Sequence, residues 1–309
     1  WRMQWARQNQ PAALAGLHVA YADLQRVHFH AIADAVQHYE EALRLDPTLI
    51  AANAQLVELH MRAGAWPRAA ELMQTELTQL EGLAQRGQAN PETTQRIGDL
   101  HVQLSKLASE QHADLPSAAR HLQAAIKTTP QSLAALEAFG KLYLGSGKAT
   151  EDGMAKASGI FLKAAMLARD AGDRRKAVDL LRRTLALRPD HYEAAEALAE
   201  LLADANHWTE LDDHYRTMLM YLTGPQRLAV LLRRAQNLDQ RLARREEARI
   251  CYEEAGQYQT AEGEAWVALE RLYREAEDWH ALATLLEWKV EQLGEGVALR
   301  SLLDTANVF

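Results

Sequence analysis

Several residue types and patterns are scarce in this chain of 309 residues. A single cysteine, Cys251, excludes an internal disulfide framework, and its place in an expected helix predicts a buried, unreactive thiol. No apolar run approaches the roughly 18 residues that a membrane-spanning helix needs, and no signal-peptide pattern is present. Only 8 prolines and 16 glycines interrupt the chain, and β-branched residues are sparse. These absences disfavour disulfide-stapled, membrane-inserted and strand-rich classes of protein.

Alanine, leucine and charged residues are abundant. Ala and Leu lose little conformational freedom in a helix, so the composition favours helix nearly throughout. The formal net charge of −8 is unevenly distributed. Residues 190–213 carry eight acidic side chains and no Lys or Arg, and residues 216–249 carry eight arginines. An acidic block therefore lies directly before an arginine-rich one.

Three stretches, 34–47, 117–130 and 176–189, share one pattern that ends in a proline. Each has a small residue, a large one four positions on, a third residue three later, and Pro five further. Spacings of four and three put the first three side chains on one helical face, where small ones let a neighbouring helix approach closely. The proline marks the helix end, because it cannot continue the hydrogen-bond ladder. The shared residues are Ala35, Tyr39, Ala42 and Pro47; Ala118, Leu122, Ala125 and Pro130; and Ala177, Leu181, Thr184 and Pro189.

The helices between these stretches share further patterns. Residues 136–143 read L-x2-F-G-x2-Y, residues 266–273 read W-x2-L-E-x2-Y, and residues 157–164 read A-x3-F-x2-A. Over about residues 12–293 the sequence resembles the tetratricopeptide repeat family, whose 34-residue unit reads W-x2-L-G-x2-Y, then A-x3-F, then A, then P. The resemblance implies an all-α fold: a right-handed solenoid, or superhelix, of antiparallel helix pairs with about 15–16 helices.

Tryptophans recur at one place in these repeats. Trp66, Trp208 and Trp279 each follow a turn and begin an expected helix. Recurrence at one register indicates packing between repeats rather than a binding function.

We expect five segments: a lead-in over 1–11, regular units over 12–130, irregular units with a phase slip over 131–190, regular units over 191–293, and the first helix of a truncated unit over 294–309. The third unit has a first helix lengthened by roughly eight residues. In the irregular region we expect three helices, at about 132–145, 151–170 and 174–188, where paired repeats need an even number. Either the middle helix serves two units and buries Phe161 on both sides, or a short extra helix over 149–158 breaks at Gly159.

Both ends of the chain suggest a longer natural protein. The sequence begins at Trp1 rather than Met, which leaves room for a removed targeting segment. Leu299, Leu302 and Leu303 give the last expected helix an apolar face with no partner helix. We expect the natural chain to continue and to be cytoplasmic.

No motif for catalysis, metal binding or nucleic-acid recognition is complete. The segment 145–150, GSGKAT, lacks the earlier glycine, the Ser/Thr after the lysine and the preceding strand of a phosphate loop. The histidines form no H-E-x-x-H or Cys/His motif, and Asp212 and Asp213 beside His214 indicate a solvated helix start. The segment 227–249 holds Asp239, Glu246 and Glu247 among its arginines, and no stacking aromatics interleave with them. We therefore predict no enzymatic activity, no cofactor, no metal and no nucleic-acid partner.

The resemblance also implies where a partner would bind, because in this family the first helices of successive units line the concave face. The carboxylate clamp of co-chaperones is absent, since Ala20, Leu24 and Gln55 stand where it needs Lys or Asn. Either the charged residues of adjacent units pair across the groove, or the acidic ones recognise a basic partner segment. The candidate residues are Glu193, Glu196, Glu200 and Asp204 in one unit, Arg233, Arg234 and Arg241 in the next, and Glu137 and Lys141 earlier.

The sequence thus predicts a non-catalytic scaffold or adaptor that binds a partner protein or peptide in the concave groove. The alternative is a regulatory or substrate-recruiting arm of a larger enzyme whose catalytic domain lies outside this chain. Self-association through open solenoid ends is a third arrangement.

Overall fold

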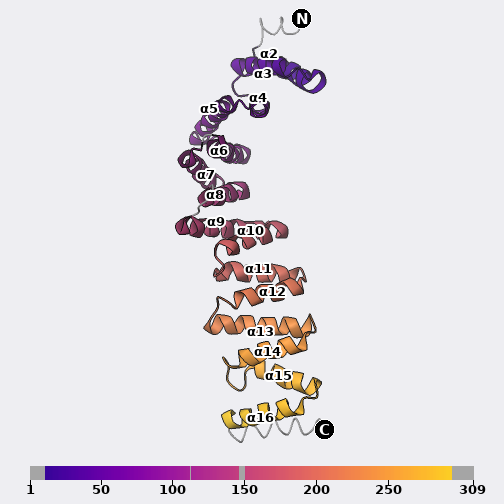
Figure 1. Cartoon of the computed structure of the whole chain (residues 1–309). Helices are drawn as coiled ribbons and strands as arrows, with labels where there is room; N and C mark the ends of the chain where they lie inside the picture. The colour runs from indigo at the N-terminus through magenta and orange to yellow at the C-terminus, as the bar shows by residue number, and fades with distance from the viewer. Residues whose placement is uncertain (1–10, 112, 146–149, 294–309) are drawn as a thin grey trace. The chain divides into compact units, whose positions relative to one another are not determined.

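The computed structural model describes residues 11–111, 113–145 and 150–293, which form helices and no strands. In this part of the chain, fifteen α-helices (α2 to α16) and one short π-helix follow one another (Figure 1). The predicted all-α class is confirmed. The chain divides between Leu167 and Ala168 into two compact units. Residues 1–10 of the predicted lead-in, residues 146–149 and the predicted helix over 294–309 lie outside the described residues.

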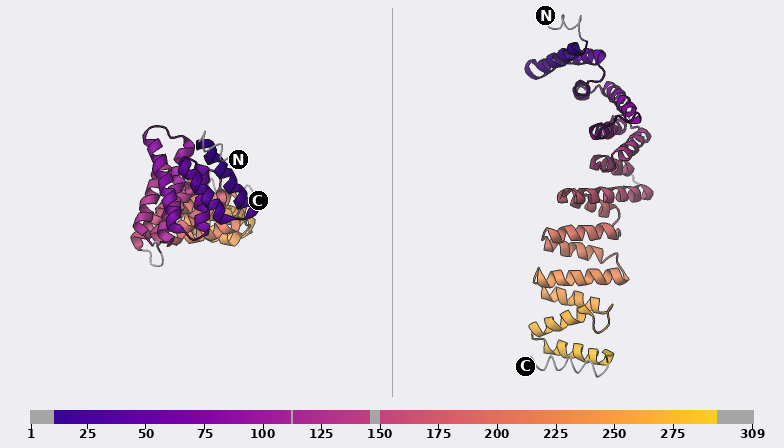
Figure 2. Two further views of the ribbon diagram at one scale, coloured as in Figure 1. Left: turned by 90° about the horizontal axis from the view of Figure 1, so that it is seen from above. Right: turned by 180° about the vertical axis from the view of Figure 1, so that it is seen from behind.

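Unit 1 is a succession of antiparallel helices (Figures 1 and 2). From α2 to α8, each helix packs against the next one in the chain. The elements are α2 (Pro11–Leu24), the π-helix η1 (Gln25–Phe29), α3 (Ile32–Leu45), α4 (Ile50–Arg62), α5 (Trp66–Gln85), α6 (Pro91–Gln111), α7 (Leu115–Thr128), α8 (Leu133–Leu144) and most of α9 (Glu151–Asp170).

Unit 2 repeats this construction from α10 to α16, again with each helix packed against its successor. Helix α13 begins at Gly224, and Pro225 follows in its first turn. The elements are α10 (Arg174–Leu187), α11 (Tyr192–Asp204), α12 (Trp208–Met218), α13 (Gly224–Gln240), α14 (Arg245–Gly256), α15 (Glu264–Glu275) and α16 (Trp279–Leu293).

The small-large-small face that the sequence predicts lies in the core. Its three residues in each of α3, α7 and α10 are at most 1% exposed. Burying a side chain of Leu or Tyr size contributes about 1.5–3 kcal/mol, while the alanines let neighbouring helices approach. This face therefore explains how α3, α7 and α10 pack against their neighbours.

Helix ends also follow the sequence signals. Helices α3, α7 and α10 each end two residues before their prolines, as predicted. Trp66, Trp208 and Trp279 are the first residues of α5, α12 and α16. Among the described helices, none combines the length and the apolar character needed to cross a membrane.

Two helices in unit 1 depart from the regular repeat. Helix α6 has 21 residues, in line with the predicted lengthening of the third unit's first helix. Helix α9 runs without interruption through Gly159, so the alternative of a helix broken there is wrong. Phe161 of α9 is buried, and a Cβ placed on Gly140 of α8 would lie 2.5 Å from its ring. A glycine at position 140 is thus what lets the aromatic ring pack on α8.

Candidate binding surfaces

Unit 1 has an open groove of about 700 Å³ between two first helices, α6 and α8, with α7 at its base. Its walls are largely apolar, with Val102 from α6, Leu115 and Leu122 from α7, and Ala138 and Leu142 from α8. The part of α6 that extends the helix adds Lys106, Ser109 and Glu110 to the lining. We call this site the α6–α8 groove. The lengthened part of α6 thus extends one wall of the groove.

Four charged side chains line the α6–α8 groove: Lys106 and Glu110 from α6, and Glu137 and Lys141 from α8. The structure thus brings the two predicted residues, Glu137 and Lys141, to one surface. Within the part of the chain that the structure describes, Lys106, Glu110 and Lys141 form no ion pair. Their charges are free to meet a partner's.

The predicted acidic residues all lie on α11 of unit 2. Glu193, Glu200 and Asp204 are exposed, whereas Glu196 is half-buried. Positions three and four apart share one face of a helix, so these carboxylates form a stripe. We call it the α11 stripe. The side chains around each carboxylate determine whether it is already paired with a basic residue.

Glu196 is paired with Arg233, across two successive first helices, α11 and α13. The guanidinium donates two hydrogen bonds, at 2.6 and 2.8 Å, one to each carboxylate oxygen. Burial disfavours the charge of Glu196, but hydrogen bonds from Arg233 and Tyr192 outweigh it and lower the pKa of its carboxyl. The same bonds raise the pKa of Arg233. The predicted pairing of charged residues between adjacent units is therefore correct for Glu196 and Arg233.

The other two predicted arginines face elsewhere. Arg234 donates a hydrogen bond of 2.7 Å to Asp212 of α12. Asp212 is only 1% exposed and also accepts from Arg216, so its assignment to a solvated helix start is wrong. The guanidinium of Arg241 lies 4.8 Å from the ring centroid of Trp208. Neither arginine neutralises the α11 stripe, because each is occupied by α12.

The other three carboxylates of the α11 stripe are paired weakly or not at all. Asp204 lies 3.7 Å from Arg174 of α10, an exposed contact that contributes little. Among the described residues, Glu193 and Glu200 form no ion pair. The stripe therefore presents two unpaired carboxylates, two helical turns apart.

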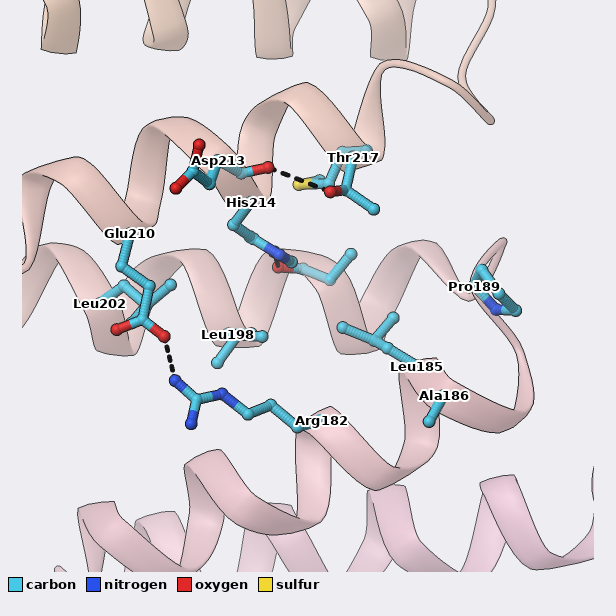
Figure 3. A pocket seen from close by; sticks show the side chains of 12 residues that line it. Arg182, Leu185, Ala186, Pro189, Leu198, Leu202, Glu210, Asp213, His214 and Thr217 are labelled. Carbon is cyan, nitrogen blue, oxygen red and sulfur yellow. Dashed lines mark hydrogen bonds and ion pairs between the residues drawn. The ribbon is translucent and has the colours of Figure 1, made fainter.

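Unit 2 has a cavity of about 390 Å³ between α10, α11 and α12 (Figure 3). Leu185, Leu198 and Leu202 line it, and an ion pair between Arg182 and Glu210 stands at its side (Figure 3). His214 also lines it, but its Nε2 donates to the Ala195 carbonyl at 2.8 Å, and burial lowers its pKa. This hydrogen bond needs the proton on Nε2, and it ties α12 to α11.

One buried polar network was not foreseen. Glu76 of α5 is 4% exposed and accepts hydrogen bonds from Asn53 of α4 at 2.6 Å and from Arg96 of α6 at 2.6 Å. A buried carboxylate is costly unless it is paired in this way. Asn53, Glu76 and Arg96 follow one another at intervals of about 20 residues, and this spacing is the only sign of the network in the sequence.

The residues that the structure describes contain no cluster of three or more His, Cys, Asp or Glu side chains able to hold a metal ion. Cys251 is buried, as predicted, and burial raises the pKa of its thiol. A raised pKa keeps the thiol protonated and weakly nucleophilic.

Successive antiparallel helices, with a small-large-small face on α3, α7 and α10, define the architecture. The chain has a tetratricopeptide-like helical-repeat fold. No family model matches the sequence, and no curated protein matches it.

Solved structures of repeat proteins are similar to this chain. YrrB, described as a TPR protein with an unusual peptide-binding site, is 19% identical, with 63% of this chain and 95% of that chain covered and a TM-score of 0.34. A tetratricopeptide repeat protein from Parabacteroides merdae is 14% identical, with 84% and 97% covered and a TM-score of 0.36. PilF of Pseudomonas aeruginosa is 18% identical, with 67% and 97% covered and a TM-score of 0.32.

Proposed function

We propose that this chain is a non-catalytic scaffold that binds a segment of a partner protein on the faces formed by its first helices. The observation that carries the proposal is the α6–α8 groove, which is open and apolar along its walls, and in which Lys106, Glu110 and Lys141 form no ion pair among the described residues. Apolar side chains of a bound segment would supply affinity, at about 1.5–3 kcal/mol for each large one fully buried. The charges would set its orientation.

The groove is tested by filling it. Peptides selected from a random display library on the intact chain would be synthesised and their affinities measured by fluorescence anisotropy. Ala138→Arg places a long side chain in the groove and should weaken binding at least tenfold. Ala155→Arg, an exposed position of α9 that does not line the groove, is the matched control and should bind like the native chain. Circular dichroism checks that both variants are folded. Equal affinity for the two variants would contradict the proposal.

In unit 2 the open carboxylates of the α11 stripe favour a basic segment. Glu193 and Glu200 are seven residues apart, which on a helix is about 10.5 Å at a rise of 1.5 Å per residue. In a polyproline II segment, which has three residues per turn and rises 3.1 Å per residue, residues i and i+3 lie on one face about 9 Å apart. The stripe therefore fits two lysines or arginines at positions i and i+3 of a partner segment in that conformation.

Spacing is the test of this part of the proposal. A Lys-x-x-Lys peptide should bind more tightly than one with adjacent lysines, and its affinity should fall with added salt. Glu193→Gln together with Glu200→Gln should abolish the preference. The charge-matched control is Glu262→Gln with Glu287→Gln, two exposed carboxylates outside the stripe. If both peptides bind equally, or the control loses as much affinity as the stripe variant, the α11 stripe is not the binding site.

A further inference from the structure

Two histidine pairs recur at equivalent places in unit 1. His18 of α2 faces His38 of α3, and His101 of α6 faces His121 of α7. The partners in each pair are 20 residues apart, and the second pair lies 83 residues beyond the first, from 18 to 101 and from 38 to 121. Each pair joins the first helix of a helix pair to its second helix.

In both pairs the two Nδ1 atoms face each other at hydrogen-bond distance, 2.9 Å in the first and 3.1 Å in the second. A neutral imidazole has one N–H and one lone pair, so this contact needs a proton on one Nδ1 and none on the other. One added proton is tolerated at a far Nε2. A second would place two imidazolium N–H groups head to head, which removes the hydrogen bond and sets like charges side by side.

The surroundings of the α6–α7 pair oppose its charging. Burial is the main cause that lowers the pKa of His101, against the attraction of Glu81 of α5, whose carboxylate lies 3.4 Å from its Nε2. Burial also lowers the pKa of His121, and the charges of His101 and Arg120 add to this effect. In the α2–α3 pair, the ring of Tyr21 meets His38 edge-on, with centroids 4.5 Å apart.

We propose that the two histidine pairs are acid-sensitive contacts, which hold α2 to α3 and α6 to α7 near neutral pH and release them as the pH falls below about 6.5. Packed, each pair binds at most one proton, whereas the separated histidines bind two. Stability contributed by the contact is thus complete above about pH 6.5. Below that, the ratio of open to closed helix pair rises about tenfold per pH unit for each proton. In unit 2, no two histidine rings are in contact within the described residues.

Hydrogen exchange of the intact chain at pH 7.5 and 5.5 tests the proposal. EDTA in both buffers keeps adventitious metal ions off the imidazoles, and rates are corrected for the intrinsic effect of pH. Peptides from α2–α3 and α6–α7 should be protected about tenfold less at pH 5.5, while those from α11–α16 should change little. Equal protection of unit 1 at the two pH values would overturn the proposal.

Matched variants assign the effect to the pairs. His38→Gln with His121→Gln removes one imidazole from each pair and with it the head-to-head clash, so the pH difference should become clearly smaller, and an undiminished difference would overturn the proposal. His28→Gln with His280→Gln removes two exposed histidines and should leave it intact. If the pair variant is unfolded at pH 7.5, an NMR titration of the native imidazoles decides instead. One proton taken up per pair between pH 7.5 and 5.5 supports the proposal, and two protons per pair overturn it.

Discussion

Units 1 and 2 share one helix-pair construction but bury different polar groups. In unit 1 two pairs of imidazoles hold first helices to second helices, and one carboxylate, Glu76, sits in a network with Asn53 and Arg96. In unit 2 carboxylates paired with cations join several of the helices. Asp212 is paired with Arg234 and Arg216, Glu196 with Arg233, and Glu270 with Lys289 and Arg274. The same fold is therefore held by paired imidazoles in one unit and by ion-paired carboxylates in the other.

The difference predicts that acid weakens unit 1 first. Burial lowers the pKa of His101 and His121, so the stability they contribute is complete above about 6.5, their ordinary value, and declines below it. The pKa of Glu196 is lowered from its ordinary 4.5, because its hydrogen bonds with Arg233 and Tyr192 outweigh burial. Its contribution is present above about pH 4.5 and is lost only as the pH falls through the lower, folded value.

The largest expected effect is in unit 1, where packing of one aromatic ring is decisive. Phe161→Ala should cost about 3–5 kcal/mol in the free energy of unfolding, measured with urea, because it leaves a cavity at a fully buried site. Ile160→Ala, at the half-buried neighbouring position, should cost clearly less. A loss under about 1 kcal/mol for Phe161→Ala would place the ring near the edge of the core rather than inside it.

In unit 2 we expect a large loss of stability when a buried charged residue is replaced. Asp212→Ala should cost about 3 kcal/mol, because it strands Arg234 without its buried partner. Asp213→Ala, one residue further and exposed, should cost less than about 1 kcal/mol. Urea unfolding of the two variants at pH 7 measures the difference. Equal losses would mean that Asp212 is not the group that holds α12 to α13.

Two glycines of unit 1, Gly140 and Gly159, should respond in opposite ways to substitution by alanine. Gly140→Ala should destabilise by about 1–3 kcal/mol, since its Cβ would lie 2.5 Å from the buried ring of Phe161. Gly159→Ala has open space around it in the interior of α9 and should stabilise by about 0.5–1 kcal/mol. Thermal unfolding of both variants gives the sign. A stabilising Gly140→Ala would show that the ring is not confined by α8.

The smallest expected effect concerns the α11 stripe. Glu196→Lys should cost about 1–2 kcal/mol, because it sets a second cation against Arg233 in a partly exposed site. Glu200→Lys should change the melting temperature little, since Glu200 has no cation among the described residues. Melting temperatures of the two single variants at low and high salt make the check. A larger loss at Glu200 would show that the stripe is neutralised at a different residue.

Much of the helical pattern could be read from the sequence, because periodicity and proline are local signals. The face formed by Ala35, Tyr39 and Ala42 and its two counterparts is buried as expected, and each proline follows a helix end. The charged positions were harder to assign. Arg233 and Arg234 are adjacent, but a helix turns about 100° per residue, so one reaches α11 and the other α12. That divergence depends on which neighbour packs on each side.

The histidine pairs also could not be predicted from the sequence alone. The equal spacing of 20 in His18–His38 and His101–His121 was visible in the sequence, yet spacing alone does not bring two rings together. Their contact needs the antiparallel packing of α2 on α3 and of α6 on α7.

The sequence by itself determined where the helices lie, which of their faces are apolar, and that successive helices must pair, because these follow from local periodicity and from the need to bury each apolar face against a neighbour. Only the tertiary structure decided which carboxylates stay open, where the α6–α8 groove forms, and which histidines share a proton. Each of these depends on the register of one helix against another, and a shift of a single residue turns a side chain about 100° to a different neighbour.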